Sequence, residues 1–290
     1  MRARCRRRLV PALVWLGLAP AVPAATGADG FLPMPTTDLF RPLLADPKEP
    51  RFVMSLLSVK SDLRETTIGA VGFGENFGIL RRQGEAVDTG WQLNLAGAVF
   101  AQFDVNAPSS DLVNADYLIW LPLSWREGAW STRVRVYHQS SHLGDEFLLR
   151  VHPDRINLSF ESLEFIASYD IEGWRLYGGG EQLVRREPAE LKRGMLHAGA
   201  EYRGGVPVWR IGELGAAHLV GGLDVKSWEQ HGWSTSRSLK AGLEFRPVRD
   251  ASGSARYWNL LFEYYDGPSP YGQFYTYDVR YWGLGIGLHL

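Results

Sequence analysis

One stretch decides the fold: residues 91–104 read WQLNLAGAVFAQFD and alternate with a period of two. One face holds Trp91, Leu93, Leu95, Gly97, Val99, Ala101 and Phe103, and most of the other holds Gln92, Asn94, Ala96, Ala98, Gln102 and Asp104. Successive side chains of a β-strand point to opposite faces, so this pattern predicts a strand with one apolar face and one polar or small face.

The same period continues along the chain from Phe52 to the end, with turn residues at intervals and no long segment of helical period. The pattern predicts strands at residues 52–60, 67–82, 91–104, 113–125, 130–141, 156–169, 174–186, 194–204, 215–227, 235–246, 257–266 and 278–290. Many strands in up-and-down order suit a closed barrel, because closure leaves no unpaired sheet edge. We therefore predict an all-β fold, an up-and-down antiparallel transmembrane β-barrel of about twelve strands.

Two features favour a membrane barrel over a soluble one. Tryptophans flank the candidate periplasmic turns, as in an interfacial aromatic girdle: Trp91, Trp125, Trp130, Trp174 and Trp258. The last strand, 278–290, alternates to the carboxyl terminus and resembles the assembly signal of outer-membrane barrels, although it ends in Leu290 instead of an aromatic residue. A soluble barrel or sandwich would alternate as well, with its apolar face inward, and the period alone does not say which face is inside.

The amino terminus reads as a secretory signal peptide over residues 1–25, with five arginines before a short apolar run and small residues at Ala24 and Ala25. Residues 26–51 are proline-rich and are interpreted as a periplasmic lead-in, so the barrel domain is expected at 52–290. The mature chain would have no cysteine, which excludes thiol chemistry. Removing five arginines from 31 basic against 32 acidic residues leaves 26 against 32, a net charge of −6. No basic patch indicates nucleic-acid binding.

The most suggestive chemistry lies on the predicted strand 130–141. His138 and Ser140 share its face with Val134 and Val136, whereas Arg133 and other polar residues share the opposite face. An arginine facing lipid near the midplane costs roughly 2–4 kcal/mol. Therefore the arginine face should line the lumen, and His138 and Ser140 should point toward lipid near the outer leaflet. An imidazole two residues from a hydroxyl can accept its proton, as in a hydrolytic triad.

The segment His138-Gln139-Ser140 resembles the motif of outer-membrane phospholipase A, and its His-x-Ser pair is similar to that of the lipid A deacylases. The phospholipase resemblance implies Asn157 as the residue that orients the histidine, and the deacylase resemblance implies Glu161. The alternation along 156–169 changes face partway. Its first apolar residues, Ile156, Leu158 and Phe160, suggest that one face contacts lipid, whereas Leu163, Phe165 and Ala167 suggest the other face. A bulge near residues 161–162 would reconcile the two runs.

Acidic residues follow the pair in the loop before the next strand. Asp145 and Glu146, with Asp154, could bind calcium, which some outer-membrane lipases require. Such acids are also common on solvated loops, and His138 and Ser140 could equally be girdle residues without a catalytic role.

A wider resemblance covers most of the mature chain. Residues 38–47 (DLFRPLLADP), 71–74 (VGFG), 137–147 (YHQSSHLGDEF) and 265–274 (YDGPSPYGQF) together resemble the bacterial family called domain of unknown function 1207. The resemblance implies an outer-membrane-associated protein whose activity is not established.

Three functions remain open on the sequence: a lipid acyl-ester hydrolase acting through His138 and Ser140, a narrow passive pore, and a structural or surface protein. The partners expected are outer-membrane lipids and, through the last strand, the barrel assembly machinery. Nothing in the sequence predicts the oligomeric state.

Overall fold

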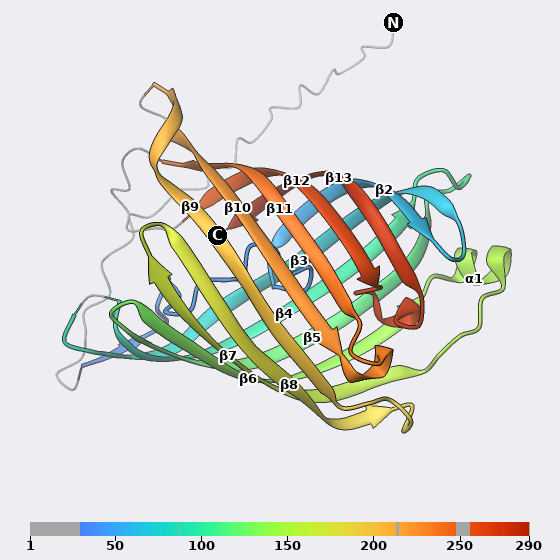
Figure 1. The fold of residues 1–290 in the computed structure, drawn as a ribbon, viewed down its shortest axis with the longest axis horizontal. Coiled ribbons are helices and arrows are strands. Elements are labelled where there is room, and N and C mark those ends of the chain that lie inside the picture. The colour runs from blue at the N-terminus through green and yellow to red at the C-terminus, as the bar shows by residue number, and fades with distance from the viewer. Residues whose placement is uncertain (1–29, 87, 213–214, 248–255, 290) are drawn as a thin grey trace, which may run out of the picture.

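The computed structural model describes residues 30–86, 88–212, 215–247 and 256–289, so the predicted signal peptide and Leu290 lie outside the described residues. Twelve antiparallel strands form a closed barrel (Figure 1). They are β2 (Phe52–Ser61), β3 (Glu65–Gln83), β4 (Gly90–Asp104), β5 (Asp111–Glu127), β6 (Trp130–Leu143), β7 (Leu158–Ile171), β8 (Trp174–Glu187), β9 (Gly194–Ile211), β10 (Gly215–Trp228), β11 (Thr235–Arg246), β12 (Tyr257–Pro268) and β13 (Asp278–His289). The barrel closes because β2 pairs with both β3 and β13. A short strand, β1 (Phe31–Pro33), pairs with the end of β3.

The predicted barrel of twelve strands is confirmed, and most strand ends agree within a few residues. The largest difference is β9, which was expected to end at 204 and continues to Ile211. Gly204, Gly205 and Pro207 have the composition of a turn, yet the segment stays extended. Beyond Tyr202, β9 pairs only with β10, so this hairpin projects past the barrel wall (Figure 1).

The apolar faces of the strands point outward. On β4, Gln92 and Asn94 are fully buried in the lumen, whereas Leu95 is 43% exposed on the outer surface. The lumen of β6 likewise holds Arg133 and Arg135, both buried. A soluble barrel would show the opposite arrangement, so the outer surface is one that suits lipid. No helix in the described part of the chain is long and apolar enough to cross a membrane.

One end of the barrel has tight hairpins ringed by exposed tryptophans. Glu172 and Gly173 join β7 to β8, and both have positive φ, as a two-residue type I′ hairpin requires. Trp125, Trp130 and Trp174 are between 42% and 53% exposed beside these turns. This ring matches the aromatic girdle expected from the sequence.

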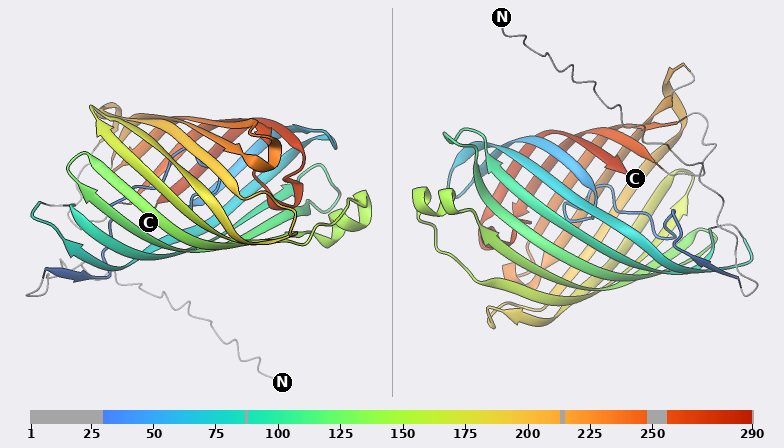
Figure 2. Two further views of the ribbon diagram at one scale, coloured as in Figure 1. Left: turned by 60° about the horizontal axis from the view of Figure 1, so that its bottom comes forward. Right: turned by 180° about the vertical axis from the view of Figure 1, so that it is seen from behind.

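Part of the lead-in occupies the barrel lumen. Residues 36–51, here called the luminal segment, fold back between the strands (Figure 2). Phe40 packs against Ile166 and Tyr177, and Leu44 packs against strands on the other side of the barrel. Residues 26–51 were predicted as a periplasmic lead-in, but residues 36–51 lie in the lumen, where their apolar side chains gain burial.

A loop enters the opposite mouth. Residues 269–277 contain the short helix η2 (Gly272–Phe274), and the Gly272 N–H donates to Asp116 in the lumen. A Cβ at Gly272 would lie 2.6 Å from that of Ser141, so only glycine allows this approach. The helix α1 (Asp145–Val151) packs alongside, with the rings of Phe147 and Phe274 5.8 Å apart. Both mouths therefore contain folded chain.

Candidate functional site

His138 and Ser140 lie on the outer surface of β6, toward the end of the barrel that carries α1. The His138 side chain is 41% exposed, and its strand neighbours Arg133 and Arg135 are buried in the lumen. The side-chain directions predicted for this strand are thus confirmed. Apolar residues lie beside His138 on the neighbouring strands: Ile119 on β5 and Leu163 on β7 are 55% and 44% exposed.

Glu161 on β7 is the residue directly opposite His138. One carboxylate oxygen, Oε1, lies 3.2 Å from Nδ1 of His138. The other, Oε2, lies 3.9 Å from Nε of Arg185, which is itself highly exposed. Ser140 faces Ser159 on the same pair of strands. The imidazole is therefore held through Nδ1, and no hydrogen bond occupies its Nε2 among the described residues.

The structure brings together His138, Ser140 and Glu161, and it leaves Asn157 apart. Asn157 precedes β7 in the loop and is exposed. It lies four residues before Glu161, or roughly 13 Å along an extended chain. Of the two residues that the resemblances suggested as the partner of the histidine, the geometry supports Glu161.

The change of face that the apolar residues of β7 suggested comes from apolar side chains that point into the lumen. Leu158 and Phe160 point into the lumen, where they join an apolar cluster with Trp120 and Tyr137, and the alternation along β7 never breaks. A register shift does occur at Glu161 and Ser162, but in the pairing with β8. Apolar residues at this end of the lumen made the inner face look like a lipid face.

The loop acids occupy the start of α1. Asp145 and Glu146 are exposed in its first turn, where negative charge interacts favourably with the helix dipole. Asp154 is also exposed in the loop that follows. Among the described residues, three side chains of types that can ligate a metal come together elsewhere, at Asp46, His197 and Asp224 in the lumen. Calcium binding by the loop acids stays a prediction.

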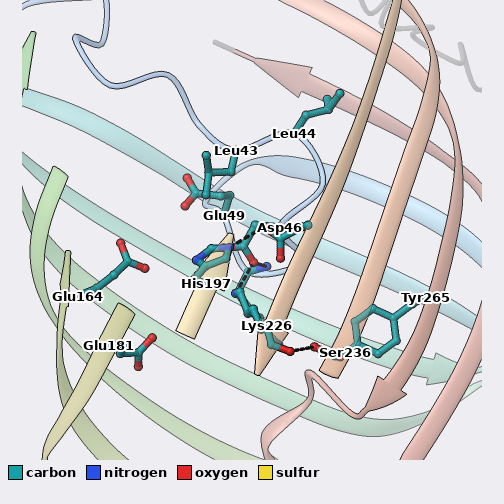
Figure 3. A network of polar contacts seen from close by, with 12 residues as sticks. Leu43, Leu44, Asp46, Glu49, Glu164, Glu181, His197, Lys226, Ser236 and Tyr265 are labelled. Carbon is teal, nitrogen blue, oxygen red and sulfur yellow. Dashed lines mark hydrogen bonds and ion pairs between the residues drawn. The ribbon is translucent and has the colours of Figure 1, made fainter. Parts of the chain in front are cut away.

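The luminal segment is anchored by buried ion pairs that the sequence analysis missed. Asp46 lies between His197 and Lys226 (Figure 3), with Oδ1 2.8 Å from Nζ of Lys226. Glu49 binds Arg133 at 2.7 and 3.0 Å and Arg135 at 3.2 Å. Both carboxylates are fully buried. The available signal was the apolar run Leu43-Leu44-Ala45 beside these acids, which is unusual for a solvated lead-in.

Lys48 links the luminal segment to the loop in the other mouth. Its Nζ lies 2.6 Å from Asp116 and 4.2 Å from the ring centroid of Tyr271. Asp116 also accepts from Gly272, and Gln273 donates to the carbonyl oxygen of Ser141 at 2.7 Å. Two of the sequence stretches that resemble one family, 137–147 and 265–274, therefore meet inside the barrel, and Lys48, which directly follows the stretch 38–47, contacts the second of them.

Known structures of similar fold are outer-membrane barrels. The chain is similar to the Salmonella typhi outer membrane phospholipase, solved as a dimer with bound calcium, with 13% identity, a TM-score of 0.53, and coverage of 87% of this chain and 95% of that one. For Escherichia coli outer membrane phospholipase A the values are 13%, 0.52, 84% and 93%. For the β domain of a Bordetella autotransporter they are 10%, 0.41, 82% and 96%. At 13% identity, the likeness to the two phospholipases shows the fold alone.

No curated protein matches the chain. A family model described as a protein of unknown function, DUF1207, matches residues 20–290, which include every described strand. The chain belongs to the DUF1207 family.

Proposed function

We propose that this protein is an outer-membrane enzyme that hydrolyses acyl esters of lipids with Ser140 as nucleophile and His138 as base. The observation that carries the proposal is the 3.2 Å contact between Glu161 and Nδ1 of an outward-facing histidine two residues from a serine. A base held through Nδ1 presents Nε2 to its nucleophile, which is the geometry of a hydrolytic triad.

The reaction follows from these three side chains. The Ser140 Oγ forms a bond to the ester carbonyl carbon while His138 Nε2 takes its proton. The carbon–oxygen bond to the leaving alcohol then breaks, and His138 returns the proton to that alcohol. Water then attacks the acyl carbon while His138 takes its proton, the bond from that carbon to Ser140 Oγ breaks, and His138 returns the proton to Ser140 as the fatty acid leaves. Glu161 accepts a hydrogen bond from Nδ1–H and stabilises the imidazolium.

Two further features support the proposal, one for ester hydrolysis and one for a lipid substrate. The Ser159 hydroxyl, opposite Ser140, is a candidate donor to the carbonyl oxygen as it becomes negative. Ile119, Val136 and Leu163 lie beside His138, toward the middle of the strands, and are between 44% and 55% exposed, so an acyl chain can lie against them. Ser140 Oγ has no hydrogen bond to His138 in the described structure, and such contacts often tighten only when substrate binds.

The test is fatty-acid release from phospholipid and from lipid A by the purified barrel, with and without calcium. The comparison set is Ser140→Ala, His138→Asn and Glu161→Gln, with His142→Asn as the control on the same strand. Relative to the wild type, we expect the activity to be at least about a thousandfold lower in Ser140→Ala and about 10²–10⁴-fold lower in Glu161→Gln. Release that is the same in the wild type and Ser140→Ala would refute the proposal. Activation by calcium that is present in the wild type and absent in Asp145→Asn with Glu146→Gln would identify those acids as the metal site.

Export and assembly complete the proposal. Residues 1–25 would direct secretion and be removed, and the terminal strand would be recognised by the barrel assembly machinery. Sequencing the amino terminus of protein isolated from outer membranes tests the first point, since residue 25 or 26 is the expected start. A start at residue 1 would contradict it.

A further inference from the structure

The end of the barrel opposite α1 contains a cavity of about 590 Å³. It borders the luminal segment at the level where β2 and β12 begin and where β11 and β13 end. Its walls combine side chains of the luminal segment, such as Arg41 and Arg51, with strand residues such as Arg203 and Arg246. The proposed lipid site lies on the outer surface toward the other end of the barrel, so the two are separate.

Positive charge exceeds negative charge in this cavity. Five arginines and three carboxylates are among its lining residues. Glu244, fully buried, is shared by two guanidinium groups: Arg203 contacts one oxygen, and Nε of Arg246 lies 2.7 Å from the other. One carboxylate therefore balances only one of the two arginines.

Arg51 adds a cation that has no acidic partner in the part of the chain that the structure describes. It is 4% exposed and donates to the main-chain carbonyls of Leu43, Leu44 and Asp46 at 2.6–2.8 Å. Among the described residues no carboxylate lies within ion-pair distance of its guanidinium. A buried charge without a counter-charge is costly, because carbonyl dipoles only partly replace water.

Asp38 and Glu75 are the other two acids of the lining, so its five arginines still outnumber its carboxylates by two. Burial raises the pKa of Asp38 to about 6, which weakens its charge in mildly acidic surroundings. Asp170, which lies outside the lining, binds Arg41 of the lining and also Arg126, each at 2.6 Å, so it is shared by two arginines. The Nε of Arg203 is buried and has no hydrogen-bond partner within the described residues. The cavity thus combines excess positive charge with an unused donor.

We propose that this cavity binds a small molecule carrying a phosphate or carboxylate group, with Arg203 and Arg246 as its main contacts. Planar guanidinium groups bind such oxyanions through paired hydrogen bonds, which suits two arginines that share a single carboxylate. The oxyanion could belong to a soluble compound or to a lipid headgroup, and the experiment separates these sources.

The test is calorimetry on the full barrel in nanodiscs of phosphatidylcholine. One arm adds pyrophosphate, and the other adds short-chain phosphatidic acid. Arg246→Gln should weaken binding about tenfold, because it removes a charged donor that is one-third exposed and tolerant of change. Glu244→Gln should tighten binding by a similar factor, because it frees both arginines. Arg237→Gln, near the other end of β11, should leave binding unchanged.

Opposite shifts in the two cavity variants support the site, and the arm that shows them identifies the source of the oxyanion. Absence of saturable binding in both arms would overturn the proposal. Equal affinity in the wild type, Arg246→Gln and Glu244→Gln would overturn it as well, since binding would then occur elsewhere. Heat-dependent electrophoretic mobility confirms that each variant is a folded barrel.

Discussion

Glu49→Gln tests whether buried charge holds the luminal segment in the barrel. Glu49 and Glu164 face Arg133 and Arg135 across contacts of 2.6–3.2 Å, so the four groups sum to zero charge. The substitution keeps the shape of the side chain and leaves one positive charge uncompensated. Because all four side chains are at most 6% exposed, water cannot replace the lost carboxylate.

Removing one partner of a buried ion pair costs about 3–5 kcal/mol. We expect the free energy of detaching the luminal segment to be lower by this amount in Glu49→Gln than in the wild type. The equilibrium constant for detachment should then rise by roughly two to four powers of ten. Arg133→Gln alone should also destabilise the segment. The double variant, Glu49→Gln with Arg133→Gln, restores a net charge of zero to the buried group. Its loss of stability should therefore be smaller than the sum of the losses in the two single variants.

Hydrogen exchange with mass spectrometry measures this opening in peptides that cover residues 38–51. Glu65→Gln, at the exposed start of β3, serves as the control and should exchange like the wild type. If exchange in Glu49→Gln is within threefold of the wild type, the ion pairs do not hold the segment. Strict additivity in the double variant would also contradict the charge argument.

Three further predictions follow from the lumen and the outer surface. Because the pKa of Asp38, which is near Glu75 and Arg81, is raised in the folded protein, ionisation of Asp38 opposes folding. The stability of the luminal segment should therefore fall as pH rises from about 4 to about 6 and level off above that pH. Hydrogen exchange at matched chemical rates should show this pH dependence in the wild type and not in Asp38→Asn. Deleting residues 36–47 should raise single-channel conductance well above that of the wild type, and equal conductance would show that the segment does not obstruct the lumen. Val136→Arg, in the middle of β6 and facing outward, should destabilise the barrel in lipid by about 2–4 kcal/mol in urea titrations, whereas an unchanged midpoint would mean that this face does not contact lipid.

The strands could be predicted from the sequence because their period is local. Residues 91–104 alternate regardless of what surrounds them, and the arginines of β6 identify the inner face by the cost of placing them in lipid. The same reasoning placed His138 and Ser140 on the outer surface. Glu161 remained one of two alternatives, because choosing it required the register between β6 and β7.

The contents of the lumen could not be predicted in this way. The luminal segment has no period, and its burial depends on partners such as Arg133 and Lys226 that are 84 and 180 residues away. Leu158 and Phe160 misled the parity argument for the same reason, since the loop at 269–277 makes that part of the lumen apolar. Contacts between distant segments decide these features, and a single sequence does not contain them.

Covalent labelling of Ser140 tests the central claim most directly. The purified barrel is treated with a fluorophosphonate, which forms a stable bond to an activated serine, and the modified residue is located by mass spectrometry. Our account predicts an adduct on Ser140 in the wild type and strongly reduced labelling in His138→Asn. An unlabelled Ser140 in the wild type, or equal labelling in His138→Asn, would contradict it.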